Sequence, residues 1–461
     1  MAEPDTRAYR AIVTRRGGSE LLLSSDTAAG SLPSLEVCSR GRLAEHLVTA
    51  TQQSSGLETY CLWFTQRAKS DGNSLSRDLA VMEVLKQHEP APTGMRWASA
   101  RELALRAGGV DRAAIRSFVE ELDGYRTNRS VAPFAQPAWI EELFDWAREQ
   151  LQPLGLHLTG GIWQLNASPT FSLIRLQTNR VPVWFKATGE PKAQERPISI
   201  ALARLLPEYV PRILGVHRSW NGWLSPHVPG RLLSETRDRL AWQIAARELA
   251  RLQIASIQPA GGLRDSGVRD LRTAKLARFI EPFIDFASEL METQEKASPA
   301  PVTTAELAFV RDRLTRACER LESLGPPDCL GRLDLSPGNI VISGGRAVFL
   351  DWAETYWGNP FLSFAYLLEH SRQRHLGEDA EALLKSSYKE PWLAVSSPEK
   401  VSDALALAPL VGVFAYAVAS RSSDSPERLA ATGAASLVRA MTRRMHREAR
   451  LLQQRPETCR C

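Results

Sequence analysis

The stretch "CLGRLDLSPGNIVISGGRAVFLDWAETYWGNP" occupies residues 329–360 and contains two aspartates, Asp334 and Asp351. Between them, Pro337-Gly338-Asn339 predicts a tight loop. An apolar run follows, broken only by a Ser-Gly-Gly turn at 343–345, which predicts a hairpin. Either the segment is a buried hairpin with polar ends, or its polar residues form a metal-phosphate site.

The polar residues of this stretch match the needs of phosphoryl transfer. That reaction requires a carboxylate for the acceptor hydroxyl, oxygen ligands for magnesium and a cation for the phosphates. Asp334 and Asn339 lie in one Pro-Gly loop and can point into one cleft. Asp351 ends the strand "AVFLD" and can bind the same metal. The alternatives are that Asp334 and Asn339 cap a turn and that Asp351 is the N-cap of a helix near Ala353.

A cation and its partner occur earlier in the chain. Lys186 is the only lysine at the end of an otherwise apolar strand, "VWFK", in a β-rich region, and Glu195 opens the next predicted helix. The two side chains can pair. The alternative is that Lys186 extends to solvent from a strand edge.

Hydrophobic periodicity predicts a small β-rich lobe followed by a larger helical lobe over 156–450. The predicted strands are 171–178, 181–189 and two within 212–228 that flank the Asn221-Gly222 turn. The predicted helices are 194–206, 237–256, 270–294, 303–324 and 361–373.

The first 130 residues are predicted as a separate small α/β domain. Strands are expected at 9–16, 19–25 and 56–64, and helices at 99–107 and 112–122. A polar segment at 126–137 precedes a helix at 138–155. The expected divisions are therefore 1–130, a linker and helix at 131–155, a β-rich lobe at 156–230, a helical lobe at 231–450 and a tail at 451–461.

The order strand-Lys, helix-Glu, D-x-x-x-x-N and strand-Asp resembles the aminoglycoside phosphotransferase and choline kinase-like superfamily, over about 156–450. This resemblance implies a bilobal, protein-kinase-like α+β fold. It also implies that Asp334 is the catalytic base, that Asn339 and Asp351 bind Mg²⁺, and that Lys186, partnered by Glu195, holds the ATP phosphates. The hinge at Pro226, His227 and Val228 would bind adenine through its backbone, and 160–172 would cover the nucleotide.

The chain departs from that superfamily just before Asp334. The superfamily usually has His-Gly there, whereas this chain has Arg332-Leu333. Arginine donates hydrogen bonds but cannot accept them, and it is always charged. Leucine restricts a backbone position where glycine is free. Both changes bear on the geometry of Asp334 and hence on the rate of catalysis. We therefore expect ATP binding, whereas the sequence leaves open whether the chain catalyses the transfer.

The N-terminal region resembles a Nudix domain, on "YRAIVTRRGGSELLL", "LPSLEV", "GLETYCLWF" and "RWASAREL". A working Nudix helix presents several glutamates to magnesium. The corresponding stretch, 42–57, has Glu45 but Gln52, Gln53 and Ser54 where acids are required. The resemblance therefore implies a degenerate domain that binds a ligand or partner. An unrelated α/β domain is the alternative.

Composition narrows the class of protein. The 461 residues are 44% hydrophobic and 24% charged, as in soluble globular proteins. No run of eighteen apolar residues and no secretory h-region is present, so a cytoplasmic protein without a membrane span is expected. The six cysteines have no zinc spacing, although Cys459-x-Cys461 could bind a soft metal or belong to a frayed tail.

Several aromatic and basic residues have two interpretations. The arginines of the last helix form either a nucleic-acid patch or, as we expect, a solvated face. Two histidines could bind a metal, but we expect them to belong to surface or hinge structure. Four tryptophans could stack on a substrate ring, but we expect them to pack in the core. These residues are Arg439, Arg443, Arg444, Arg447, Arg450, His217, His227, Trp220, Trp223, Trp352 and Trp357.

The sequence as a whole predicts an ATP- and Mg²⁺-dependent kinase that phosphorylates a hydroxyl of a small molecule. The first alternative is a nucleotide-binding pseudokinase whose N-terminal domain binds a ligand or partner. A nucleotide hydrolase centred on that domain is disfavoured by its missing glutamates. Glu354 and Glu369 lie near the expected acceptor site, but two acids do not identify the acceptor, and the oligomeric state is open.

Overall fold

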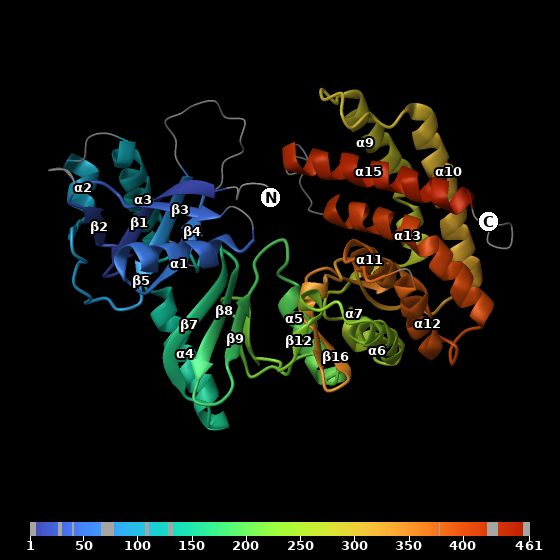
Figure 1. The fold of residues 1–461 in the computed structure, drawn as a ribbon, viewed down its shortest axis with the longest axis horizontal. Coiled ribbons are helices and arrows are strands. Elements are labelled where there is room, and N and C mark those ends of the chain that lie inside the picture. The colour runs from blue at the N-terminus through green and yellow to red at the C-terminus, as the bar shows by residue number, and fades with distance from the viewer. Residues whose placement is uncertain are drawn as a thin grey trace. The chain divides into compact units, whose positions relative to one another are not determined.

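The fold was analysed in a computed structural model that describes residues 6–25, 30–38, 41–65, 78–106, 110–127, 132–377, 379–421 and 432–454. Cys459 and Cys461 therefore lie outside the described residues. The chain forms two compact units. Unit 1 comprises Met1–Arg196 with Ile213–His227, and unit 2 comprises Pro197–Arg212 with Val228–Cys461 (Figure 1). The predicted α+β class is confirmed, whereas the predicted domain boundaries stay predictions.

Unit 1 begins with a mixed six-stranded sheet of order β4-β5-β1-β2-β6, in which β3 also pairs with β1. Among the strand pairs that the described residues form in this sheet, only β1–β5 is parallel. The strands predicted at 9–16, 19–25 and 56–64 and both helices of the region are confirmed. The elements are β1 (Thr6–Arg15), β2 (Glu20–Ser24), β3 (Ser34–Cys38), α1 (Leu43–Ser55), β4 (Thr59–Phe64), β5 (Asp78–Val84), β6 (Met95–Ser99), α2 (Ala100–Arg106) and α3 (Val110–Thr127).

The second sheet of unit 1 is antiparallel, of order β10-β11-β9-β8-β7. Side chains alternate between its faces along β9: Val183, Phe185 and Ala187 are fully buried, whereas Trp184 and Lys186 lie on the opposite face. The predicted strands are confirmed here as well. The elements are α4 (Trp139–Leu151), η1 (Gln152–Leu154), β7 (Leu158–Ala167), β8 (Ser172–Thr178), β9 (Val183–Ala187), β10 (Gly215–His217) and β11 (Gly222–Pro226).

Helix α4 joins the two sheets of unit 1 through one hydrophobic core. The Trp139 ring lies 6.1 Å from Tyr60 of the first sheet, and Phe185 of the second lies 6.4 Å away. Trp220 packs edge-on against Trp139 and is stacked on His217 at 4.0 Å. Trp220 is half-buried and packs against the core of unit 1, as expected, whereas its role toward a substrate ring stays a prediction.

Unit 2 is mainly helical. Helix α5 (Glu195–Leu205) begins in unit 1 and continues into unit 2. Two small sheets, of order β12-β15-β16 and β13-β17-β14, lie among the helices. The elements are β12 (Arg231–Leu232), η2 (Leu233–Glu235), α6 (Arg239–Ile257), α7 (Ala260–Arg264), β13 (Arg269–Leu271), α8 (Thr273–Ala277), α9 (Ile280–Glu292), α10 (Thr304–Leu324), β14 (Cys329–Arg332), η3 (Pro337–Asn339), β15 (Ile340–Ser343), β16 (Arg346–Phe349), β17 (Thr355–Gly358), α11 (Phe361–Gln373), α12 (Ala380–Trp392), α13 (Pro398–Arg421) and α15 (Thr432–Gln453).

The helix predicted at 270–294 is wrong as a single element, because its first residues form β13 and the rest divides into α8 and α9. Leu271 pairs with Gly358 of β17. A Cβ at position 358 would lie 2.5 Å from the Leu271 carbonyl oxygen, so the glycine permits this backbone approach. A partner strand distant in the sequence overrides the local helical pattern.

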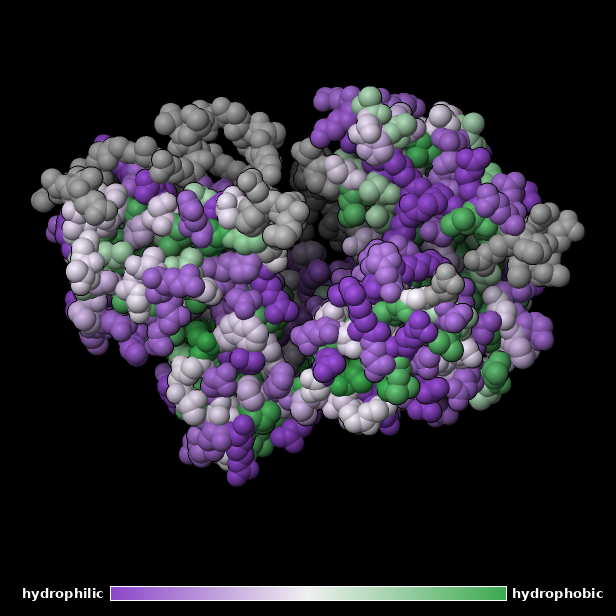
Figure 2. All heavy atoms as spheres, viewed as in Figure 1, coloured by the Kyte–Doolittle hydropathy of each residue, from purple (hydrophilic) through white to green (hydrophobic). Residues whose placement is uncertain are grey.

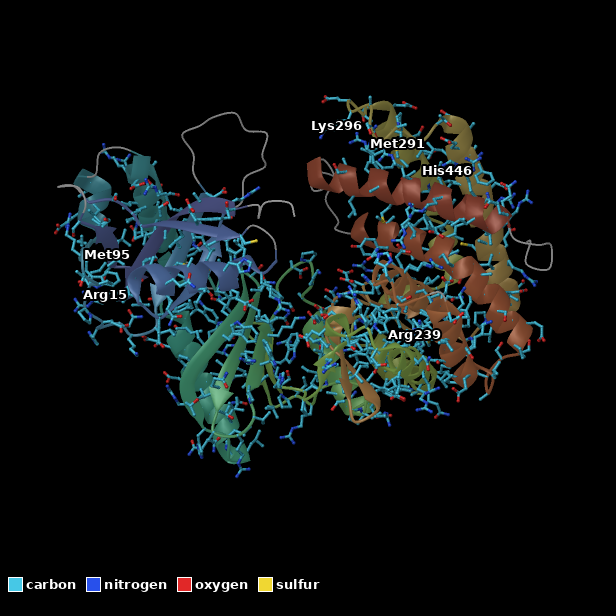
Figure 3. All side chains as sticks on the ribbon, viewed as in Figure 1. Arg15, Met95, Arg239, Met291, Lys296 and His446 are labelled. Atoms are coloured by element: carbon cyan, nitrogen blue, oxygen red, sulfur yellow. The ribbon has the colours of Figure 1, made fainter. Side chains whose placement is uncertain are left out.

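The arginines of α15 are not a wholly solvated face. Arg439 Nε donates to the Leu290 carbonyl at 2.8 Å, and Arg443 Nε donates to the Ala300 carbonyl at 2.9 Å. His446, labelled on α15 in Figure 3, lies 3.7 Å from Glu306 at the start of α10. These side chains hold α15 against α9 and α10, which weakens the nucleic-acid interpretation.

Helix α13 is long and apolar enough to cross a membrane over Pro398–Ala419, but 72% of its most apolar window is buried inside the structure. It is the one candidate span among the described residues. Hydrophilic side chains predominate over unit 2 on the face shown in Figure 2, with hydrophobic ones in separate patches. Because most of its apolar window is buried, α13 has the burial expected of a helix in the core of unit 2.

A buried carboxyl group fixes the start of α4. Glu83, on β5, accepts hydrogen bonds from the Tyr60 hydroxyl and from the Ala138 N–H at 2.6 Å. Ala138 precedes α4 with a φ of 69°, a conformation rare for residues other than glycine. Burial raises the pKa of Glu83 to about 7.

We expect Glu83→Gln to flatten the pH dependence of stability. The folded-state pKa of Glu83 lies above its unfolded value, so its contribution is complete at low pH and is lost as pH rises through about 7. The wild type should therefore lose about 3 kcal/mol more than the variant between about pH 4.5 and 8. Urea unfolding at several pH values measures this difference. Glu120→Gln, at an exposed position of α3, is the control, and parallel curves for wild type and Glu83→Gln would contradict the prediction.

Candidate active site

The β15–β16 hairpin brings Asn339 and Asp351 together. Ile340 pairs with Phe349, and the Leu350 N–H donates to the Asn339 carbonyl at 2.8 Å. Each polar residue therefore lies just beyond the last pair of the hairpin. Asp351 is exposed and Asn339 half-buried, whereas Ile340 and Phe349 are fully buried. The hairpin therefore brings the backbone of Asn339 close to the segment that contains Asp351, whereas the binding of one metal by both side chains stays a prediction.

The backbone at Asp351 is unusual. Its φ is 61°, a left-handed conformation that few residues other than glycine adopt and that is often found at functional sites. The Asp351 Oδ1 accepts a bond of 3.3 Å from the Ala353 N–H. Strand β17 follows, so the interpretation of Asp351 as a helix N-cap is wrong.

The pairing of β14 with β17 sets Asp334 beside the Asp351 segment. Arg332 is paired with Thr355, and the Leu333 N–H donates to the Glu354 carbonyl at 3.0 Å. Asp334 is exposed between Leu333 and Leu335, which are both buried. The chain thus holds Asp334, Asn339 and Asp351 on adjoining segments of unit 2, where both aspartates are exposed and Asn339 is half-buried.

Arg332, which stands where the related superfamily usually has histidine, is almost fully buried. Its backbone N–H donates to the Ser363 hydroxyl at 2.7 Å, and its guanidinium donates to the Asp334 carbonyl at 3.2 Å. The guanidinium carbon lies 5.0 Å from the centre of the Trp352 ring, within the range of a cation–π interaction. Arg332 therefore braces the backbone at Asp334 from one side and contacts the Asp351 segment on the other.

Leu333, which replaces the usual glycine, fits its position without strain. It is not among the described residues with positive φ, and its side chain lies in the core of unit 2 with 1% exposed. The expected restriction of the backbone is therefore no obstacle to this loop conformation.

Lys186 and Glu195 form an ion pair within unit 1. Lys186 Nζ lies 2.5 Å from Glu195 Oε1, and the two side chains are 13% and 1% exposed. The loop between them is held by Asn221, whose amide donates to the Thr188 and Ala193 carbonyls. The predicted pairing, with Glu195 at the first residue of α5, is confirmed.

The predicted hinge lies where the chain passes from unit 1 to unit 2, between His227 and Val228. Pro226 is the last residue of β11 and pairs with Val183. The His227 N–H donates to the Pro182 carbonyl at 2.8 Å. Val228 is half-buried. The role of Pro226, His227 and Val228 toward a nucleotide stays a prediction.

Sequence reasoning missed three residues of α11 that relate to Asp334. Ser363 anchors the Arg332 backbone, as described above. Burial lowers the pKa of His370 while the charge of Asp334 opposes that shift, and burial raises the pKa of Tyr366, an effect that the same charge reinforces. His370 and Tyr366 therefore lie within electrostatic reach of Asp334, and their helical spacing of four is the one signal the sequence offered.

Residues 185–394, which contain Lys186, Glu195, Asp334, Asn339 and Asp351, match the profile of the phosphotransferase enzyme family. The chain carries a domain of this family. The superfamily predicted from the sequence is thereby confirmed, while the Nudix-like character of the N-terminal region stays a prediction. No curated protein matches the chain.

Solved structures with similar chains include three small-molecule kinases. A type I macrolide 2'-phosphotransferase is 18% identical, covering 66% of this chain and 97% of its own, with a TM-score of 0.44. A choline kinase from Cryptosporidium parvum is 12% identical, covering 68% and 96%, with a TM-score of 0.49. An ethanolamine kinase from Plasmodium vivax is 13% identical, covering 66% and 87%, with a TM-score of 0.45.

We expect Gly331→Ala to destabilise unit 2 strongly. A Cβ at position 331 would lie 2.1 Å from Cζ of Tyr356, a fully buried ring whose hydroxyl donates to the Asn359 carbonyl at 2.8 Å. The ring cannot withdraw without losing that bond, so the cost should be about 3 kcal/mol or more. Chemical denaturation measures it. Gly261→Ala in α7, where a Cβ meets nothing within 4 Å, is the control, and equal stability of the two variants would refute the packing argument.

Proposed function

We propose that the chain is an ATP- and Mg²⁺-dependent phosphotransferase that moves the γ-phosphate to a hydroxyl of a small molecule. The observation that carries this proposal is the β15–β16 hairpin, which holds Asn339 beside Asp351 next to the loop of Asp334. These residues lie within the segment that matches the phosphotransferase family.

The oxygen donors suit magnesium. Mg²⁺ is usually bound through one or two carboxylates, with substrate phosphates and water completing its shell. The Asp351 carboxylate and the Asn339 amide oxygen would hold the ion, which when bound would neutralise charge on the phosphates. Asp334, exposed on a braced loop, would orient the acceptor hydroxyl and take its proton.

The residues proposed to hold the nucleotide lie mainly in unit 1. Lys186 would contact the phosphates, and Glu195 keeps the ammonium group in place through their ion pair. The backbone of Pro226, His227 and Val228 would bind the adenine. A long lysine needs such a partner to remain fixed, because an unpaired ammonium group samples many rotamers.

The acceptor is proposed only as a class. Near Asp334, α11 carries Glu369, which forms ion pairs with Arg372 at 3.6 Å and Arg444 at 3.7 Å. The negative charge of Glu369 is already balanced by these two arginines, so it does not argue for a cationic acceptor. A fold shared by many kinases does not identify the substrate. The cytoplasmic location and the absence of a nucleic-acid or membrane partner stay predictions.

Asp334→Asn should strongly reduce turnover while preserving nucleotide binding. The amide cannot accept the hydroxyl proton, and loss of a general base costs about 10²- to 10⁴-fold in rate. ADP release with ATP, Mg²⁺ and a small-metabolite extract measures the reaction. The melting temperature with MgATP measures binding, which should equal that of the wild type. If the wild type releases no ADP but is stabilised by MgATP, the chain is a nucleotide-binding pseudokinase instead.

Asp351→Asn should weaken binding of MgATP but not of ATP in excess EDTA. The substitution removes the charged metal ligand and leaves Lys186 and the hinge intact. The stabilisation by MgATP should therefore fall to the level seen without metal. Asp379→Asn, at the N-cap position of α12, serves as the control for loss of one carboxylate. An unchanged response of Asp351→Asn to MgATP would show that the metal site has been placed wrongly.

A further inference from the structure

The N-terminal sheet domain of unit 1 closes the exposed edge of the second sheet. Strand β7 is the edge strand, and α1 and β4 pack against it (Figure 1). The buried Gln164 amide accepts from the Cys61 N–H at 2.7 Å and donates to the Cys61 carbonyl at 2.8 Å. This side chain pairs with β4 as another strand would, so the attachment is specific and leaves neither amide atom without a partner.

A second contact to the N-terminal domain is made from the opposite face of β7. The indole N–H of Trp163 donates to the Glu45 carboxylate of α1 at 2.8 Å. Glu45 is the single acid that α1 retains among the positions considered for a hydrolase. Its carboxylate is engaged by the second sheet, which gives this residue a role other than metal binding.

Trp163 begins a row of side chains that crosses the second sheet. Trp163 pairs with Arg175 on β8, and Arg175 pairs with Trp184 on β9. The Arg175 guanidinium carbon lies 4.1 Å from the centre of the Trp163 ring and 6.0 Å from that of Trp184. Both distances fall within the range of cation–π attraction, so the cation links the two rings.

The row ends at the predicted hinge. The Trp184 indole N–H donates to His227 Nδ1 at 3.2 Å. Burial, together with the charge of Arg175, lowers the pKa of His227, which keeps this nitrogen free to accept. The contacts are thus continuous from α1 to His227, through one residue on each of three neighbouring strands.

This row shares its face of the sheet with Lys186. Trp184 and Lys186 are two residues apart on β9 and therefore project to the same side. We propose that Glu45, a positioning residue, transmits the docking of the N-terminal domain through Trp163, Arg175 and Trp184 to His227, and thereby sets the affinity for nucleotide. The nucleotide part of this inference rests on the function proposed above.

Docking alone does not require the row. The Gln164–Cys61 bonds and the shared core around α4 already attach the N-terminal domain. Removing the Glu45 acceptor should therefore leave the domain attached and disturb only the row. This separation makes the proposal distinguishable from a purely structural role.

The first experiment detects the row without nucleotide. The full chain is labelled with 5-fluorotryptophan, and the Trp163 and Trp184 ¹⁹F resonances are assigned with Trp163→Phe and Trp184→Phe. In Glu45→Leu both resonances should shift, although Trp184 makes no contact with Glu45. In Glu45→Gln, which keeps an acceptor oxygen, both should stay near their wild-type positions. Gln53→Leu, at an exposed position of α1, is the matched control.

The second experiment measures the affinity for a non-hydrolysable ATP analogue with Mg²⁺ by calorimetry. Glu45→Leu should weaken binding about fivefold or more, a typical coupling between sites. Glu45→Gln and Gln53→Leu should bind as the wild type does. Trp163→Phe, which keeps a ring but loses the N–H donor, should behave as Glu45→Leu does, and it replaces that variant if the leucine prevents folding.

The outcomes separate this inference from the proposed function. A shift confined to the Trp163 resonance, or unchanged affinity in both Glu45→Leu and Trp163→Phe, overturns the coupling. If the wild type binds no nucleotide, the proposed function fails and so does the nucleotide part of the inference. The ¹⁹F shifts then still decide whether the row transmits the contact.

Discussion

The register of β14 against β17 is the constraint on which the candidate site depends. It places Arg332 opposite Thr355 and so holds the loop of Asp334 against the segment that begins at Asp351. Gly331 makes the register possible, since any Cβ there would enter the Tyr356 ring. The β15–β16 hairpin then returns Asn339 to Asp351. Three polar side chains are thus placed by backbone pairing, and a shift of one residue would reverse their orientation.

A second constraint in unit 1 concerns two buried acidic side chains, Glu195 and Glu83. The Glu195 side chain is almost entirely buried, and its burial is tolerated because Lys186 Nζ lies 2.5 Å from Glu195 Oε1. Removing one partner of such a pair leaves an uncompensated buried charge, which is strongly destabilising. Glu83 shows the other solution, because its raised pKa favours the neutral acid. The ion pair therefore fixes the position of the Lys186 side chain, whereas the Glu83 carboxyl group links β5 to Tyr60 and to the start of α4.

What the sequence could predict follows from the range of the interactions. The hairpin, the Lys186–Glu195 pair and most strands and helices depend on residues close in the chain, so periodicity and turn residues sufficed. The Ser363, Gln164 and Trp163 contacts join residues separated by 31, 103 and 118 positions. The sequence contains no local sign of such contacts. The same holds for β13, whose strand state depends on Gly358.

The presence of Arg332 where the related superfamily usually has histidine is compatible with an ordered Asp334 loop. A histidine can donate and accept at once, and arginine only donates. The group it must hold here is the Asp334 carbonyl, which needs a donor. Burying the guanidinium is costly, and the face of Trp352 and the Asp334 carbonyl offset part of the lost hydration. Arginine also remains charged at every physiological pH, whereas the number of N–H donors on histidine changes near neutrality. The brace in this chain is therefore insensitive to pH, and any pH dependence of a reaction at this site must arise from other groups.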